Sequence, residues 1–413
     1  MKKLILSGLA ASALLFASCS DDDDNNPTPT PGGDDDGGQT TQLYNEDGTW
    51  TDETLASFEE KVTMNPNATG ADQSVFDWTI AKGGITLNTD MGDAQQLTEI
   101  TENTTLDQPK YEIQGAVFVR SGATLTIPEG TWFYADPSNN AEGNEGVNSA
   151  DVLIIEQGAK IMAEGTAEKP IVFTSTDETS GSWGGIVILG KAPINLEGNT
   201  GIAEVSDNAG EDLTYGGDAA DDNSGSLKYV SLAYPGTQIN TDAEFNGFSF
   251  YSVGRKTILE NLEVYEGKDD GYEWFGGTAE ATNLYSHAYD DSFDWTDGWQ
   301  GALTNIVADQ PENAGYCIEA DNLKADPNAT PRSNPTIKDA TLISSGAQDA
   351  AILFRLGTSV NLSNAVIEIN KPDVVNINIS DLVTGQLLLD NSTVLKDIKF
   401  DEENPYFTGN ANK

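Results

Sequence analysis

The dipeptides Asn261-Leu262, Asn283-Leu284 and Asn305-Ile306 stand 22 residues apart. A second marker has nearly the same period and recurs at spacings of 24, 21 and 23 residues: Phe248-Ser249-Phe250, Tyr272-Glu273-Trp274, Phe293-Asp294-Trp295 and Tyr316-Cys317-Ile318. Between the markers, short alternating segments rich in β-branched and aromatic residues are separated by Gly, Asn and Asp turns, a pattern typical of strands. Two markers with one period predict an all-β solenoid of stacked coils, each about 22 residues long.

The same pattern begins earlier in the chain. Residues 119–127 are echoed by residues 155–163, and each stretch contains a Gly-Ala step and is followed by a turn. These segments and the 22-residue units resemble right-handed parallel β-helix proteins of the pectate-lyase-like class. The resemblance covers about residues 112 to 400 and implies a right-handed parallel β-helix. It implies no particular activity, because a fold does not determine a function.

The repeated asparagines and the two ends of the solenoid have structural explanations. Stacked side-chain amides bond one another, so we expect the asparagines to form a ladder along one turn of the coils. Residues 51–62 carry capping residues and place Leu55, Phe58 and Val62 on one helical face, which predicts a helix. We expect this helix and residues 63–111 to close the N-terminal end, and residues 372–413 to close the other end. The expected organisation is a signal peptide (1–18), a linker (19–41), an N-terminal cap (42–111) and a β-helix with its C-terminal cap (112–413).

The N-terminus has the features of an export signal. Met1-Lys2-Lys3 precedes an apolar run that ends at Cys19, and this position of the cysteine makes the segment look like a lipoprotein signal with Cys19 as the lipidated residue. Residues 20–41 are rich in Asp, Pro, Thr and Gly, which predicts a disordered spacer. A serine and four aspartates directly after Cys19 resemble the export signal of Bacteroidota-type surface lipoproteins. The resemblance implies a lipid anchor in the outer membrane, with the protein facing the extracellular side.

Charge restricts the partners. The chain has 67 acidic and 21 basic residues, a formal net charge of -46. Such a field repels polyanions, so nucleic acid is excluded as a partner, whereas neutral glycans, cationic ligands, metal ions and other proteins remain. The chain has 2 cysteines, and because Cys19 is assigned to the lipid, no disulfide is expected to stabilise the fold.

Two acidic and aromatic stretches, residues 269–277 and 290–299, are the main candidates for a functional site. Strand alternation places the first and third residues of each marker triplet inside and the middle residue outside, so Glu273 and Asp294 should lie side by side on adjacent coils. Like charges in this arrangement destabilise a sheet unless a cation, a base or a shared proton compensates them. Ca²⁺ takes six to eight oxygen ligands, and the candidate ligands are Asp269, Asp270, Glu273, Asp290, Asp291, Asp294 and Asp297.

Other interpretations of these carboxylates remain open. Glu273 and Asp294, about 5 Å apart, match the carboxylate separation of a retaining glycoside hydrolase. The resemblance to polysaccharide lyases of this fold implies Ca²⁺ together with an Arg or Lys base. Arg355 is the candidate for that base, although none of the chain's four arginines lies in the two stretches. The third interpretation is a solvated acidic face over an aromatic core.

A binding function is favoured over catalysis. Sugars stack on aromatic rings while carboxylates accept hydrogen bonds from their hydroxyls. Phe275, Tyr289 and Trp299 lie outside the inward register and are expected to be exposed platforms for such stacking. We therefore expect a surface lipoprotein that binds a glycan or another nutrient. Its resemblance to lipoproteins that work beside TonB-dependent transporters implies such a transporter as a partner. A Ca²⁺-dependent carbohydrate-active enzyme and a purely structural surface solenoid are the alternatives.

Overall fold

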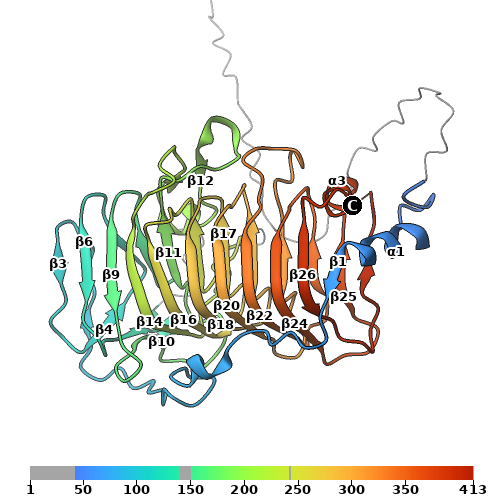
Figure 1. Ribbon diagram of the computed structural model, residues 1–413. Coiled ribbons are helices and arrows are strands. Elements are labelled where there is room, and N and C mark those ends of the chain that lie inside the picture. Colours follow the sequence, from blue (N-terminus) through green and yellow to red (C-terminus); the bar gives the residue numbers. More distant parts are fainter. Residues whose placement is uncertain (1–41, 140–149, 241–242, 413) are drawn as a thin grey trace, which may run out of the picture.

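The chain winds into a parallel β-helix in the computed structural model, which describes residues 42–139, 150–240 and 243–412 (Figure 1). The signal peptide, Cys19 and the linker predicted for residues 1–41 lie outside the described residues. The helical segments are short: α1 (Asp52–Glu60), α2 (Ser206–Ala209), α3 (Leu382–Leu389) and the 3₁₀ turns η1 (Gln73–Phe76), η2 (Pro137–Asn139) and η3 (Glu197–Asn199). None of the helices in the described part of the chain has the length and apolar character needed to span a bilayer.

Two long parallel sheets form the walls of the coils. The 15-stranded sheet follows the order β1 (Val62–Met64), β26 (Val394–Lys399), β24 (Asn361–Ile369), β22 (Thr336–Ser344), β20 (Ala302–Asp309), β18 (Glu280–Ala288), β16 (Ile258–Gly267), β14 (Gly225–Ala233), β10 (Ile171–Ser175), β7 (Trp132–Ala135), β4 (Lys110–Ile113) and β2 (Gln95–Gln96), and is joined by β3 (Thr104–Thr105), β6 (Thr124–Ile127) and β9 (Lys160–Glu164).

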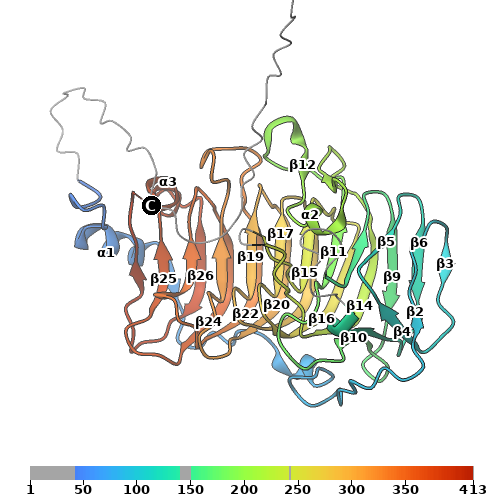
Figure 2. The same cartoon turned by 180° about the vertical axis from the view of Figure 1, so that it is seen from behind.

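The 10-stranded sheet faces the first sheet across the core. Its strands can be followed in Figure 2, which shows the molecule from the side opposite to that of Figure 1. Its order is β27 (Phe407–Thr408), β25 (Val375–Ile379), β23 (Ala350–Phe354), β21 (Ile318–Ala320), β19 (Phe293–Thr296), β17 (Tyr272–Phe275), β15 (Phe248–Tyr251), β11 (Ile186–Leu189), β8 (Val152–Ile155) and β5 (Ala116–Val119). The predicted all-β parallel solenoid is therefore confirmed, and each coil adds one strand to each long sheet along the middle of the molecule.

The inward face of the 10-stranded sheet is aromatic, as the alternation predicts. Phe248, Tyr272 and Phe293 pair in register on successive strands, and their rings stack with centroids 5.4 and 5.5 Å apart. The next coil departs from the predicted alignment, because Phe293 pairs with Ile318 and not with Tyr316. The spacing of the repeated triplets assigned Tyr316 and Cys317 to the strand, but both lie in the loop before β21. The outward position in β21 therefore belongs to Glu319 and not to Cys317.

The asparagine ladder is also present. Asn283 donates from Nδ2 to Asn261 Oδ1 at 2.9 Å, and Asn305 donates to Asn283 Oδ1 at 2.8 Å. All three residues have φ between 57° and 61°, the left-handed conformation that asparagine tolerates better than most residues. The recurring asparagine therefore marks the bend at which one strand of the 15-stranded sheet changes direction within each coil.

The prediction that residues 51–62 close the N-terminal end is wrong. The helix forms as α1, with the Thr51 hydroxyl accepting from the backbone N–H of Thr54, but it lies at the C-terminal end of the solenoid beside α3 and β27. Its Phe58 is fully buried against Trp50 and Phe407. Strand β1 then pairs in parallel with β26. An amphipathic helix covers whichever open core it can reach, and its sequence does not say which end that is.

After β1 the chain returns along the outside of the coils to the N-terminal end, visible in Figure 1 as the blue segment along their lower edge. Thr69 donates its backbone N–H to Asn364, Asp72 to Asn305, and Ile80 and Ala81 to the carboxylate of Glu263. These partners lie on successively earlier coils. We call residues 65–90 the strap, and it explains why Glu263, an outward residue of β16, is fully buried.

A second insertion covers part of the outer face of the 10-stranded sheet. Residues 190–224, between β11 and β14, contain α2 and the antiparallel pair β12 (Gly201–Ile202) and β13 (Thr214–Tyr215). We call them the cover. Val205 and Leu213 from the cover pack against Val187, Leu189 and Tyr251 on the outer side of the sheet in a second apolar core. The cover lies over the early strands of this sheet, and the strands that follow β15 carry the candidate site.

Candidate functional site

The outward positions beyond the cover are acidic. Ser249, Glu273 and Asp294 occupy paired positions on β15, β17 and β19, and Glu319 follows on β21. Adjacent strands of a sheet are about 4.8 Å apart, so the three carboxylates form a row along the solenoid. The predicted neighbourhood of Glu273 and Asp294 is therefore confirmed. Glu319 extends the row, and the sequence analysis missed it because the loop before β21 shifted the alignment.

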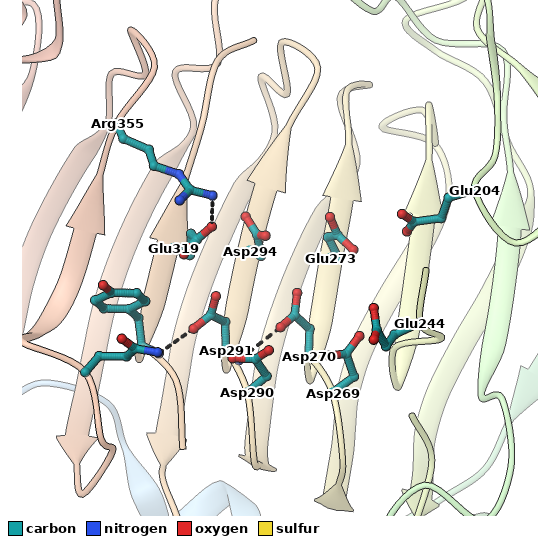
Figure 3. A pocket seen from close by; sticks show the side chains of 12 residues that line it. Glu204, Glu244, Asp269, Asp270, Glu273, Asp290, Asp291, Asp294, Glu319 and Arg355 are labelled. Carbon is teal, nitrogen blue, oxygen red and sulfur yellow. Dashed lines mark hydrogen bonds and ion pairs between the residues drawn. The ribbon is translucent and has the colours of Figure 1, made fainter. Parts of the chain in front are cut away.

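The turns that lead into β17 and β19 add a second row. Asp269 and Asp270 precede β17, and Asp290 and Asp291 precede β19, so the turns stack as their strands do. The backbone N–H of Asp291 donates to Asp270 Oδ1 at 2.9 Å, and that of Tyr316 donates to Asp291 Oδ1. Figure 3 shows these turn aspartates below the row of strand carboxylates. Main-chain donors hold one oxygen of Asp270 and one of Asp291.

Together the two rows form a pocket of about 210 Å³, which we call the acidic groove. Its walls come from the coils, the cover and the loops around β23, and it is lined by Glu204, Glu244, Asp269, Asp270, Glu273, Asp290, Asp291, Asp294, Tyr316, Glu319, Gln348 and Arg355. Glu204 comes from the cover and Glu244 from the loop before β15. Sequence reasoning missed both, since nothing in their local sequence indicates that these insertions fold back towards β17.

The groove disfavours ionised carboxylates. Burial, followed by the negative charge of neighbouring carboxylates, raises the pKa values of Asp270, Asp291 and Asp294 well above that of an ordinary aspartate. Burial also raises the pKa of Glu204 to about 7, although the Tyr251 hydroxyl donates to it at 3.2 Å and acts in the opposite direction. The folded protein therefore places carboxyl groups where negative charge is unfavourable unless a proton or a cation compensates it.

Two sets of these carboxylates have the geometry of a cation site. Oxygens of Asp270, Asp291 and Asp294 lie within 4.8 Å of one another, and the same is true of Asp269, Asp270 and Asp290. Asp294 is only 4% exposed, and its Oδ1 atom has no hydrogen-bond partner in the part of the chain that the structure describes. A buried carboxylate oxygen without a donor is unfavourable. Oxygen donors of this kind fit Ca²⁺, a hard cation that accepts flexible coordination geometry.

Arg355 does not have the environment of a catalytic base. Its guanidinium lies at the β21–β23 side of the groove, where it forms an ion pair with Glu319 (Figure 3). A second ion pair joins it to Asp321 at 2.8 Å. Arg355 is the only basic side chain among the described residues that line the groove. An arginine held between two carboxylates keeps its proton, so the expectation that Arg355 acts as a base is not supported by its contacts.

Other predicted site residues lie away from the groove. Asp297 accepts a hydrogen bond from the hydroxyl of Tyr215 in the cover at 2.8 Å, and burial raises its pKa to about 6. The expectation that Phe275 and Trp299 are exposed platforms is wrong. Phe275 is buried against Tyr251, with ring centroids 4.0 Å apart, and Trp299 is fully buried.

The burial of these rings has two different causes. The Trp299 ring stacks on Trp274 at 4.7 Å because its turn folds back into the core. Phe275 points outward but lies beneath the cover. Tyr289 is 38% exposed, as predicted, and its hydroxyl donates to Glu266 at 3.0 Å. Tyr289 is thus the one predicted platform that presents an accessible ring.

The coils and the acidic groove define a parallel β-helix that carries a carboxylate-rich site on the outer face of one sheet. A family model described as a pectate-lyase-like β-helix domain matches residues 98–412. The protein belongs to this family of pectate-lyase-like β-helix domains. No curated protein and no solved structure matches the chain. Family membership accounts for the coils but assigns neither a ligand nor a reaction to the groove.

Proposed function

We propose that the acidic groove binds Ca²⁺ and that the loaded groove captures an extracellular ligand, a glycan or another nutrient. The observation that carries the proposal is that Asp294, one of a set of three close carboxylates, has a buried Oδ1 atom without a hydrogen-bond partner among the described residues. Asp270 and Asp291 each use one oxygen for a main-chain donor, which holds them in position. A divalent ion would supply the missing partner of Asp294 and compensate the crowded charge.

Capture of a ligand is the second part of the proposal. A bound Ca²⁺ keeps coordination positions that hydroxyl or carboxylate oxygens of a ligand can complete. Tyr289, next to Asp290 in the chain, offers an exposed ring beside the turns of the groove. The net charge of -46 opposes long polyanions, so neutral glycans are the favoured class.

The cellular setting belongs to the same proposal. We infer from the sequence up to Cys19 and the acidic segment behind it that the protein is a lipid-anchored lipoprotein of the outer membrane, facing outwards. Captured material would then pass to a TonB-dependent transporter, the partner implied by resemblance to lipoproteins of this kind. Metabolic labelling with an alkyne fatty acid tests the anchor, since Cys19→Ala should abolish the label, and protease accessibility on whole cells tests the orientation.

One experiment tests binding and catalysis together. The chain from residue 20 onward is incubated with neutral and acidic polysaccharides, with Ca²⁺ or with EDTA, and both retention and cleavage products are scored. Ca²⁺-dependent retention without products is the expected result. Retention that is unchanged in EDTA would contradict the role of the cation. No Ca²⁺ binding and no retention would leave a structural cell-surface solenoid.

A carbohydrate-active enzyme is the second candidate function. It is favoured by the pairing of Glu273 with Asp294 on adjacent strands, since raised pKa values allow one carboxyl to stay protonated beside an ionised one. A glycoside hydrolase fits this pair better than a polysaccharide lyase, which needs a base that Arg355 does not provide. Products that disappear in both Glu273→Gln and Asp294→Asn would establish the enzyme.

A further inference from the structure

The carboxylates of the strand row in the acidic groove differ in their hydrogen-bond partners. The row consists of Glu273, Asp294 and Glu319, which occupy paired outward positions on β17, β19 and β21. The buried amide of Asn246 donates from Nδ2 to Glu273 Oε2 at 2.5 Å. The guanidinium of Arg355 donates to Glu319. Each outer member of the row therefore has a side-chain donor, whereas one oxygen of Asp294 has no partner within the described ranges of the chain.

The strand positions on either side of the row are uncharged. Ser249 on β15 and Leu353 on β23 pair with the two outer carboxylates. Asn246 lies in the loop before β15 and also donates to the Ser249 hydroxyl at 3.3 Å. Arg355 directly follows β23. The two donors thus come from the coils that flank the three carboxylates, one donor at each end of the row.

The central carboxylate of the row is the one that approaches the turn aspartates. Oxygens of Asp294 lie within 4.8 Å of oxygens of Asp270 and Asp291. Neither Glu273 nor Glu319 belongs to such a set of three among the residues described, although each lies one strand away from Asp294. A carboxylate that accepts a hydrogen bond from a fixed donor is held in its orientation. The two donors therefore keep the outer carboxylates distinct from the central one.

We propose that Asn246 and Arg355 are positioning residues for the cation site of the acidic groove. They hold the two outer carboxylates of the row back from the ion, so that Ca²⁺ binds at Asp294 and the turn aspartates. The inference rests on the proposed cation-binding function and adds the residues that decide which carboxylates bind the ion. Asn246 is only 2% exposed and Arg355 is itself a cation, so both act through the carboxylates that they hold.

Both donors also act on the charge of the row. Burial, followed by the charge of Asp294, raises the pKa of Glu273 well above that of an ordinary glutamate, and the hydrogen bond from Asn246 acts in the opposite direction. The positive charge of Arg355 likewise opposes the larger effect of burial, which raises the pKa of Asp294. The donors therefore favour ionised carboxylates, the state that binds a metal ion.

The test counts the water molecules on a bound ion, with Tb³⁺ as the probe and Ca²⁺ as its competitor. Luminescence lifetimes in H₂O and D₂O are measured on the chain from residue 20 onward. Asn246→Ala releases Glu273 towards the ion, which should then carry about one water molecule fewer, because a carboxylate oxygen replaces it. Glu273→Gln in the Asn246→Ala background should restore the original number. Arg355→Gln should have the same effect as Asn246→Ala through the released Glu319.

Two variants with similar losses are the controls. Asn376→Ala removes a fully buried amide that donates to main-chain carbonyl groups outside the groove. Arg120→Gln removes an arginine that pairs with three carboxylates outside the groove. Both should keep the number of water molecules on the ion. An unchanged number in folded Asn246→Ala and Arg355→Gln would overturn the positioning role and leave the proposed function intact. No bound Tb³⁺ or Ca²⁺ in the folded, unchanged chain would overturn both.

Discussion

Asp294 carries the argument for function more than any other residue. Its strand position faces outward, yet the side chain is only 4% exposed, and one of its oxygens has no donor among the described residues. Surface carboxylates are common in a chain with 67 acidic residues and need no explanation. A buried carboxylate with an unpartnered oxygen does need one, because an unsatisfied buried polar group is unfavourable.

We expect Asp294→Asn to stabilise the calcium-free protein and to reduce calcium binding. Burial raises the pKa of this carboxyl group well above that of an ordinary aspartate, so removing it should increase the free energy of unfolding of the calcium-free protein at pH 8. Urea unfolding in EDTA measures the gain, and calorimetric titration measures the loss of calcium affinity. The exposed Asp373→Asn should change neither quantity, and a destabilised Asp294→Asn in EDTA would contradict the argument.

Trp299 is expected to act through stability and not through ligand binding. Trp299→Ala removes a fully buried ring that stacks on Trp274 and should lower the free energy of unfolding by about 3 to 5 kcal/mol. Tyr289→Ala, at an exposed ring, is the comparison and should change stability by less than about 1 kcal/mol. Thermal unfolding of both variants measures the difference. A Trp299→Ala protein of unchanged stability would mean that the ring is not part of the core.

Among the elements of the fold, the asparagine ladder connects the coils along one bend. Asn283 donates to Asn261 and accepts from Asn305, and its own backbone has φ 60°. Each rung therefore combines side-chain hydrogen bonds with a backbone conformation that few other residues tolerate. The strap follows the same line of bends, and the Asn305 amide takes part in both, since its Oδ1 accepts from Asp72.

Two substitutions at Asn283 separate the contribution of the side-chain hydrogen bonds from that of the backbone conformation. Asn283→Gly loses the two ladder bonds but adopts a positive φ freely, so it should lower the unfolding free energy by roughly 2 kcal/mol. Asn283→Ala also adopts the left-handed conformation with a β-carbon and should lose about 1 to 2 kcal/mol more. Denaturant titration of both variants measures the difference. Equal losses in the two variants would show that the backbone conformation contributes nothing.

The N-terminal helix is expected to be needed for the opposite end of the solenoid. A chain that begins at residue 65 lacks α1 and β1, which exposes the edge of β26 and the apolar side chains packed around Phe58. We expect this chain to unfold at lower temperature and to self-associate through the open edge. Size-exclusion chromatography and thermal unfolding measure both effects. A chain that begins at residue 42 keeps α1 and β1 and should match the longer chain.

Over the whole molecule, charge and the acidic groove predict an unusual pH dependence. Burial raises the pKa of Glu204 from 4.5 to about 7 and that of Asp297 from 3.8 to about 6. At pH values between the ordinary and the raised pKa of each group, that group binds more protons in the folded protein than in the unfolded chain. The free energy of unfolding therefore falls as pH rises from about 4 to about 7. Each group's contribution disappears at low pH, where both states are protonated.

We expect the melting temperature in EDTA to decrease between pH 5 and pH 8, and Ca²⁺ to restore it at pH 8 because the ion favours the ionised carboxylates. A calcium concentration 100 times the dissociation constant adds about 2.7 kcal/mol. Differential scanning calorimetry measures the shifts, and NaCl at matched ionic strength separates screening of the negative charge from specific binding. A melting temperature that rises with pH in EDTA would contradict the assignment of these groups.

The sequence by itself determined the coil. The 22-residue period, the alternation of Phe248, Tyr272 and Phe293 with outward residues, and the asparagine bends are local patterns, and each coil repeats the environment of its neighbour. For the same reason the sequence placed Glu273 beside Asp294 and the turn aspartates on stacked turns. These predictions needed only the strand period and the spacing between adjacent coils.

The tertiary structure alone decided everything that depends on segments outside this repeat. The sequence does not show that α1 closes the C-terminal end, that Phe275 lies under the cover, or that Glu204 and Glu244 reach the acidic groove. Insertions and terminal segments are not tied to the coil period, so their positions follow from which apolar surfaces remain open after the coils have formed. The coils placed carboxylates in rows, and the insertions added Glu204 and Glu244 to the groove that these rows form.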